Sequence, residues 1–396
     1  MINNKNNTSK KKNRWVTVIL IVIASIVCLA LLTRTVWREI IIYQSKSANE
    51  ISEMVSVELG GIKQNVLIEG KFDDLPVLIA VHGGPGTPIP MGCAYRGVYN
   101  NLSCNYIFVQ WDQYGCGINK GELDETFSVE RYTDMLCDLV SYLTERFPSN
   151  DLYLFGMSWG TVLTCKVAND MPDIIDGVIA YGQIVDNVLA YKNAYEVLNS
   201  CELTDKERKA LDNAMENTSN PDFLVVYDLM CKYTNGIDYN GEEDTNTKFY
   251  TTALYMLVSP DYSVVDIYNA LDSLVSDNGS QKLYEEINTI NMKSELERIS
   301  IPYHIVQGAD DLNTPTDLVE DVIDELDNDF ISYTCFDNSG HIPTDSCWDS
   351  LMELIEESAN FRVDKSLYRF FEHADVRNVA DMFQERERAM MVSFAR

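Results

Sequence analysis

Basic residues are scarce in this chain of 396 residues, and those present gather at its beginning. The chain has 31 Lys and Arg against 61 Asp and Glu, a formal net charge of −30. Residues 1–44 hold seven of the basic side chains and one Glu, so the other 352 residues carry a formal charge of −36. A body this acidic repels phosphate backbones, which argues against a nucleic-acid partner, whereas a small cationic ligand remains compatible with it.

Patterns that bind metals or phosphates are also missing. The chain has only four histidines, and its ten cysteines form neither a C-x-x-C pair nor a Cys/His cluster, so the sequence offers no zinc site. The Gly-rich loop from Gly83 to Gly86 lacks the following Lys-Ser/Thr of a phosphate-binding loop. We therefore expect a protein that works without a metal or a cofactor.

Only one hydrophobic run is long enough to cross a membrane, from Trp15 to Thr33. As a helix these nineteen residues span roughly 28 Å, about one hydrocarbon core. Five basic residues precede the run and only Arg34 and Arg38 follow closely, which places the N-terminus in the cytoplasm and the body outside the cell membrane. A cleaved signal peptide is the alternative, but the run is long for one and no small-x-small site follows it. We predict a cytoplasmic tail at 1–14, a transmembrane anchor at 15–33 and a linker at 34–50.

Short apolar runs follow the anchor. Ile51 to Leu59 and Ile62 to Ile68 flank two glycines and predict a hairpin with a Gly-Gly turn. Three further runs show little alternation, as is typical of strands buried on both faces of a parallel sheet. Between the second and third, Val129 to Arg146 has helical spacing, and strand, helix and strand in this order predict an α/β crossover architecture. The three runs are Pro76–Val81, Tyr106–Trp111 and Leu152–Phe155.

Strand patterns then give way to helical ones and later return. From about Gln183 to Asn291 the sequence is helical and Tyr-rich, after which strand patterns resume at Ile301–Val306 and Phe330–Cys335, with a helix at Cys347–Ser358. An insertion that interrupts a sheet in this way indicates a lid over a core. We predict a core in two parts, 51–182 and 299–360, a helical cap at 183–298, and a tail of unknown role at 361–396.

A serine flanked by glycines follows the third strand of the core. The sequence reads Gly156-Met157-Ser158-Trp159-Gly160 and continues into a helical stretch, Thr161 to Asn169. A serine between strand and helix needs a strained turn, and glycines two residues before and after it allow the neighbouring chains to approach. This context indicates a nucleophile elbow with Ser158 as the nucleophile, rather than an ordinary Gly/Ser turn.

A serine hydroxyl needs a base that accepts its proton. His341 lies in the loop between the last strand and the last helix, the position of a catalytic base. His82 lies in the Gly-rich loop, His304 lies within a strand and is interpreted as a satisfied core residue, and His373 lies in the tail. For the carboxylate that orients the base, either Asp310 or Asp311 is suitable, because both follow the preceding strand.

Hydrolysis through a tetrahedral intermediate also needs two backbone N–H donors for the oxyanion. The residue after the nucleophile, Trp159, supplies one. The second is expected from Gly83 or Gly84 in the sequence His82-Gly83-Gly84-Pro85-Gly86, where glycine lets the main chain approach a substrate closely.

Three motifs follow one another along the chain: H-G-G-P-G, then W-D-Q-Y-G-C-G at Trp111 to Gly117, then G-M-S-W-G. Together they resemble the proline iminopeptidase family of α/β-hydrolases. The resemblance covers about Val55 to Ser358. It implies an α/β-hydrolase fold with a mostly parallel sheet and an inserted helical cap, to which the hydrophobic run at 15–33 adds an N-terminal transmembrane helix. The family's Gly-x-x-Asp pattern falls on Gly308 to Asp311 and so favours Asp311 as the acid of a Ser158, Asp311, His341 triad.

Members of that family remove an N-terminal residue, often proline, from short peptides and hold the free amine with carboxylates largely from the cap. Four cap residues are candidates for this role, Glu196, Glu202, Glu242 and Glu243. We therefore expect a membrane-anchored serine hydrolase that acts on a small peptide or acyl substrate, with an aminopeptidase as the leading hypothesis. An esterase for small acyl esters and a non-catalytic ectodomain with a hydrolase fold are the alternatives.

Overall fold

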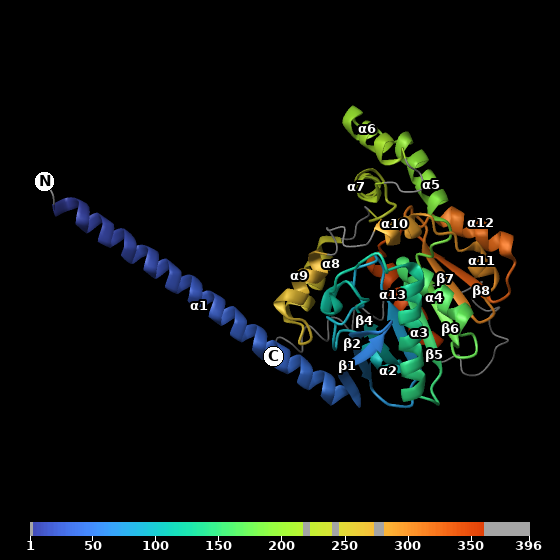
Figure 1. Ribbon diagram of the computed structural model, residues 1–396, viewed down its shortest axis with the longest axis horizontal. Helices are drawn as coiled ribbons and strands as arrows, with labels where there is room; N and C mark the ends of the chain where they lie inside the picture. Colours follow the sequence, from blue (N-terminus) through green and yellow to red (C-terminus); the bar gives the residue numbers. More distant parts are fainter. Residues whose placement is uncertain (1–2, 217–221, 240–244, 273–280, 360–396) are drawn as a thin grey trace.

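A computed structural model of the chain describes residues 3–216, 222–239, 245–272 and 281–359 (Figure 1). Its centre is a sheet of eight strands in the order β1-β2-β4-β3-β5-β6-β7-β8. The β1–β2 and β2–β4 pairs are antiparallel and all other pairs are parallel. The strands are β1 Ile51–Leu59, β2 Ile62–Gly70, β3 Val77–Val81, β4 Ile107–Trp111, β5 Leu152–Met157, β6 Gly177–Tyr181, β7 Tyr303–Gly308 and β8 Ile331–Phe336.

Helices cover both faces of this sheet, which explains why its central strands are apolar without alternation. Every residue of β3, β4, β6 and β7 is buried. One face packs against α3 (Val129–Arg146), α4 (Trp159–Asp170) and α12 (Thr316–Leu326). The other face packs against α2 (Asn100–Asn105) and α13 (Asp345–Ser358). The predicted α/β architecture with a mostly parallel sheet is confirmed.

The chain between β6 and β7 is helical in its described parts. Polar side chains define where its helices begin: Asp186 caps α5, Thr204 and Glu207 form a capping box on α6, and Asp222 caps α7. Helices α5 to α7 enclose a small apolar cluster of their own, whereas α8 and α9 lie beside α1 (Figure 1). The helices are α5 Asn187–Ser200, α6 Asp205–Ala214, α7 Phe223–Tyr233, α8 Thr245–Val258, α9 Val264–Asp272, α10 Gln281–Asn288 and α11 Lys293–Glu297.

The N-terminal helix α1 (Asn3–Ala48) extends away from the body (Figure 1). Its apolar stretch has a mean hydropathy of 3.0, and none of it is buried within the protein, so it is not a core helix. The segment 34–50, predicted to be a linker, continues the helix through Ala48. No Gly or Pro interrupts residues 15–48, and its last turns pack on the body, where Ser45 is buried. The tail at 361–396 lies outside the described residues.

Candidate active site

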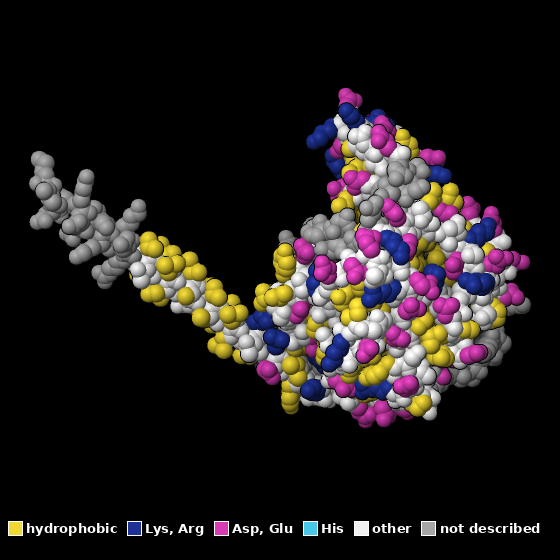
Figure 2. All heavy atoms as spheres, viewed as in Figure 1, with side chains coloured by type: hydrophobic (Ala, Val, Ile, Leu, Met, Phe, Trp, Pro, Cys, Tyr) yellow, Lys and Arg dark blue, Asp and Glu magenta, His cyan; other side chains and the backbone are white. Residues whose placement is uncertain are grey.

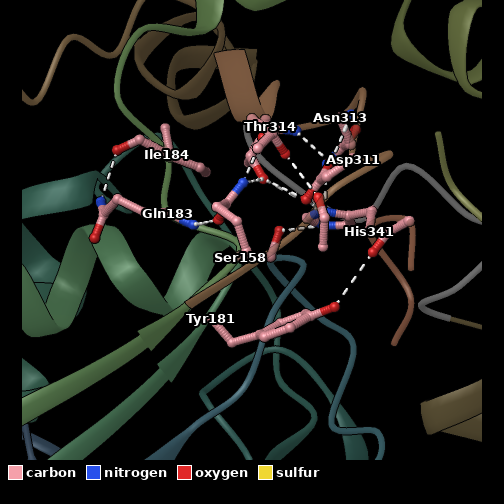
Figure 3. Close-up of polar contacts among 12 residues, drawn as sticks. Ser158, Tyr181, Gln183, Ile184, Asp311, Asn313, Thr314 and His341 are labelled. Atoms are coloured by element: carbon pink, nitrogen blue, oxygen red, sulfur yellow. Dashed lines mark hydrogen bonds and ion pairs between the residues drawn. The ribbon is translucent and has the colours of Figure 1, made fainter. Parts of the chain in front are cut away.

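Ser158 occupies a sharp turn between β5 and α4 (Figure 3). Its φ of +49° and ψ of −119° are in a region that non-glycine residues rarely adopt. A Cβ on Gly160 would lie 2.0 Å from the Val81 carbonyl oxygen, and one on Gly156 would lie 2.6 Å from Thr164 Oγ1. Both glycines are therefore required sterically, and the close packing that they permit supports the strained serine.

His341 and Asp311 meet Ser158 at the carboxyl ends of the parallel strands. His341 Nε2 lies 2.9 Å from Ser158 Oγ, and His341 Nδ1 lies 2.8 Å from Asp311 Oδ2 (Figure 3). A carboxylate only accepts hydrogen bonds, so Nδ1 carries the proton toward Asp311 and the lone pair of Nε2 faces the serine hydroxyl. This arrangement allows the imidazole to accept the proton of Ser158.

Asp311, rather than Asp310, is the carboxylate in contact with His341. Its side chain is fully buried, and its oxygens accept hydrogen bonds from the backbone N–H groups of Asn313 and Thr314 and from Thr314 Oγ1, at 2.7–2.9 Å. Asp310 is largely exposed. Desolvation of the covered part of its carboxyl and the negative charge of Asp337 raise the pKa of this group. Three donors fix the Asp311 carboxylate in one orientation, which in turn fixes the imidazole ring.

The Gly-rich loop passes close to the serine. A Cβ on Gly83 would lie 3.3 Å from Ser158 Cβ. His82 is buried, and desolvation lowers the pKa of its imidazole to about 4, so the ring is neutral. Its Nε2 accepts the Gln113 N–H at 2.9 Å, which leaves Nδ1–H to donate to the Gly83 carbonyl at 2.7 Å. The C=O and N–H of a trans peptide point in opposite directions, so the Gly84 N–H points away from His82.

Trp159 begins α4, and its backbone N–H has no acceptor within the helix because it belongs to the first turn. Trp159 and Gly84 thus remain the candidate donors of the expected oxyanion pair. Gln113, which the sequence analysis did not single out, links the two loops: its Nε2 donates to the His82 carbonyl at 2.8 Å, and its Oε1 accepts the Trp159 indole N–H at 2.9 Å.

Asp112 anchors the loop before α9 to this scaffold. It is fully buried, and its carboxylate accepts hydrogen bonds from the backbone N–H groups of Cys93 and Ile118 and from the Tyr262 hydroxyl. Burial raises the pKa of Asp112 to about 6, against the opposing effect of these donors. The hydroxyl of Tyr262 therefore compensates a buried carboxylate that has no cationic partner among its contacts.

We expect Tyr262→Phe to lower the free energy of unfolding by about 1–3 kcal/mol, and by more at pH 8 than at pH 5. The folded pKa of Asp112 lies above its unfolded value of about 3.9, so stability falls as pH rises from about 4 to about 6. The Tyr262 hydroxyl donates to the ionised Asp112 carboxylate and lowers its pKa. Without this hydroxyl the folded pKa of Asp112 is higher, so the stability continues to fall up to a higher pH. Urea unfolding in detergent measures the effect. The matched control is Tyr195→Phe, because the hydroxyl of Tyr195 donates to a carboxylate that is exposed, that of Asp212. Equal stability of the Tyr262→Phe and native proteins at pH 8 would contradict it.

The other predicted candidates lie apart from this centre or outside the described chain. His304 is buried in β7, with its ring nitrogens 2.5 and 3.0 Å from the hydroxyls of Ser332 and Thr334, as expected of a satisfied core residue. Among the described residues, no group of three or more His, Cys, Asp or Glu side chains is arranged to hold a metal ion. His373, Glu242 and Glu243 lie outside the described residues, whereas Glu196 and Glu202 are exposed on the cap.

A cap segment that the sequence did not identify runs beside His341. The backbone N–H of His341 donates to the Gly236 carbonyl at 3.1 Å, and the N–H of Ile342 donates to that of Ile237 at 2.9 Å. Asp238 continues this segment and forms a parallel bridge with Ile342. The pairing brings the backbone of Asp238 next to the loop that carries His341, a proximity for which the sequence carries no local pattern.

Comparison with known proteins places this fold among the hydrolases. The profile of the family described as serine aminopeptidase, S33, matches residues 92–344. The protein named Probable aminopeptidase YbaC of Bacillus subtilis (strain 168) is 23% identical over 297 residues, which cover 74% of this chain and 92% of that protein.

Among the solved structures that share the fold, two each match 78% of this chain over 98% of their own length. They are VinJ, with a TM-score of 0.57 and 18% identity, and the proline iminopeptidase of Mycobacterium smegmatis, with a TM-score of 0.53 and 16% identity. These similarities confirm the α/β-hydrolase fold that the motifs predicted. The chain belongs to the serine aminopeptidase S33 family of α/β-hydrolases.

Proposed function

We propose that this protein is a membrane-anchored serine hydrolase that releases N-terminal residues, such as proline, from short peptides. The observation that carries the proposal is the continuous series of contacts from Ser158 Oγ through His341 to buried Asp311, at 2.9 and 2.8 Å. This series lies at a strained elbow and fits the roles of a nucleophile and a base with its orienting acid. The N–H groups of Trp159 and Gly84 are the proposed donors for the oxyanion.

In the proposed reaction, Ser158 Oγ attacks the carbonyl carbon of the first peptide bond while His341 Nε2 takes the hydroxyl proton. The Trp159 and Gly84 N–H groups stabilise the tetrahedral oxyanion. His341 then returns its proton to the leaving amine, the C–N bond breaks, and the N-terminal residue remains as an ester on Ser158. Water, deprotonated by His341, hydrolyses this acyl-enzyme, releases the residue and restores the serine.

An aminopeptidase must also recognise a free amine. We propose that a cap carboxylate contacts the substrate ammonium group, and Asp238, whose backbone bridges to Ile342 in the loop that carries His341, is the candidate to test first. Such a contact desolvates both charges, so a substrate without the positive charge loses a charge-assisted hydrogen bond in the site. The cost is about 2–5 kcal/mol, which corresponds to roughly 30-fold or more in kcat/KM.

We therefore expect a prolyl amide with a free amine to be hydrolysed roughly 30-fold or more faster, in kcat/KM, than its N-acetylated counterpart. Asp238→Asn should reduce this preference, whereas Glu202→Gln, on the exposed part of the cap, should leave it unchanged. Steady-state kinetics of the full chain in detergent, with a simple acyl ester as a third substrate, measure both effects. Equal rates on free and acetylated amides would eliminate the aminopeptidase and favour the esterase.

The anchor predicts a defined topology. Five basic residues before Trp15 hold that end in the cytoplasm, so the hydrolase body faces outward. Protease added to intact cells should cleave the body, and antibody detection should find the first 14 residues protected. A body that is protected until the membrane is broken would contradict the outward orientation, and a mature protein that lacks residues 15–33 would establish a cleaved signal sequence instead.

A further inference from the structure

A group of large apolar side chains is exposed on α8 and α9. Leu254 and Leu257 of α8 are 56% and 52% exposed, and Val264, Val265 and Tyr268 of α9 are 59%, 65% and 65% exposed. We call these five residues the α8–α9 face. In the surface view, apolar side chains gather on the body where α1 meets it, over the position of α8 and α9 (Figure 2). Exposed apolar groups that cluster in this way mark an interaction surface.

Hydrogen bonds hold this face at a defined position along α1. Arg34 and Arg38 are the first charged residues after the apolar run. Arg34 donates to the carbonyls of Leu257 and Tyr262 at 2.7 Å, and Arg38 donates to that of Pro260. The connection between α8 and α9 therefore lies at the level where the apolar run ends. If α1 spans a bilayer, that level is the boundary between hydrocarbon and headgroups.

The same connection is held firmly to the body. Asp261 forms a bidentate ion pair with Arg96, at 2.6 and 2.8 Å, and both side chains are at most 10% exposed. Arg96 also donates to Ser52 Oγ at 2.7 Å, and Ser52 in turn lies 2.6 Å from Ser45 Oγ near the end of α1. Anchor helix, α8–α9 connection and sheet are thus joined by one buried polar network, so the face cannot swing away from α1.

The charges around the face favour an apolar rather than an electrostatic partner. No Lys or Arg occurs in α9, and its acidic residues already have partners within the protein: Asp266 accepts from the Ser263 N–H, and Asp272 lies 3.9 Å from Lys120. The acidic body opposes binding to anionic surfaces. Aliphatic residues with a tyrosine are suited to the interfacial zone of a bilayer.

We propose that the α8–α9 face is a second membrane-contact surface, which inserts into the outer interface of the bilayer that α1 spans. This inference rests on the membrane anchoring proposed above. It assigns to α8 and α9 of the cap a role in seating the hydrolase on the membrane, so that the body has a fixed orientation relative to the lipid. The binding is driven by apolar burial, and a zwitterionic bilayer is sufficient for it.

The test uses the full chain in phosphatidylcholine nanodiscs that contain a diazirine-bearing phosphatidylcholine. After illumination, mass spectrometry of peptides should find lipid adducts both in residues 15–33 and in residues 254–268. In the double variant Val265→Glu/Tyr268→Glu, the amount of lipid adduct in residues 254–268 should fall roughly tenfold or more. The amount of adduct in residues 15–33 and the kcat/KM for a soluble amide should stay unchanged. Leu224→Glu, on the exposed and distant helix α7, should change neither.

Three results would overturn the proposal. Adducts in residues 15–33 alone would leave the anchor intact and refute only the α8–α9 face. Absence of adducts from both regions would refute the anchor and the face together. Absence of lipid adducts from 254–268 in nanodiscs that each hold two copies of the chain would identify the face as a contact between copies.

Discussion

Ser158→Ala should lower kcat by about 10⁴- to 10⁶-fold without unfolding the protein. The substitution removes only Oγ, the atom that would attack the substrate, and the residual rate comes from the oxyanion donors and from substrate binding. His341→Ala should cause a loss of similar size, and the double variant should be little worse than either single variant, because the two residues act as one unit.

Steady-state kinetics on a prolyl amide measure this effect, with thermal unfolding as the test of folding. Ser141→Ala is the matched control, because Ser141 lies exposed on α3 and its hydroxyl donates only to the Cys137 carbonyl of the same helix. It should leave kcat unchanged. Substantial turnover by purified Ser158→Ala protein would remove Ser158 from the mechanism.

Asp311→Asn should lower kcat on the order of 10⁴-fold. The carboxylate accepts the Nδ1 proton of His341 and so leaves Nε2 free to accept the serine proton. An amide that turns its NH₂ toward Nδ1 would stabilise the wrong tautomer. Because Asn also cannot accept all the hydrogen bonds that Asn313 and Thr314 donate, the variant should be less stable, and its unfolding must be measured alongside its kinetics.

Asp310→Asn is the control for this prediction, since it makes the same chemical change one residue earlier on an exposed side chain. It should affect kcat little. A larger loss in Asp310→Asn than in a folded Asp311→Asn protein would reverse the assignment of the acid.

Much of the fold and of the candidate site follows from local sequence patterns. The two glycines around Ser158 are required by backbone atoms only 2–3 Å from where their side chains would begin, so a strand followed by Gly-x-Ser-x-Gly carries its own structural explanation. The predicted apolar runs of β3, β4, β5 and β7 similarly reflect burial on both faces, whereas β6 was not predicted. Such features are predictable because each depends on neighbours that the local chain path determines.

Other features depend on contacts between distant segments. Apart from the Gly-x-x-Asp pattern of the family, nothing in the local sequence separates Asp310 from Asp311, because the physical difference arises from Thr314 and from a loop 30 residues away. Gln113 joins two loops through hydrogen bonds that span 31 and 46 residues. The position of Asp238 beside His341 has the same origin. The helix at residues 34–48 could not be predicted for a similar reason. It is stabilised by contacts with the connection between α8 and α9, which lies more than 200 residues later in the chain.

If Ser158 is an activated nucleophile, it should react covalently with a fluorophosphonate. The reagent reacts with a serine whose proton is removed by a base and leaves a phosphonyl group whose oxygen occupies the oxyanion position. Peptide mass spectrometry of the labelled full chain should find the phosphonyl group on Ser158, with labelling abolished in Ser158→Ala and His341→Ala proteins that remain folded. A folded native chain that resists the reagent, or that is labelled on a different residue, would contradict this role of Ser158.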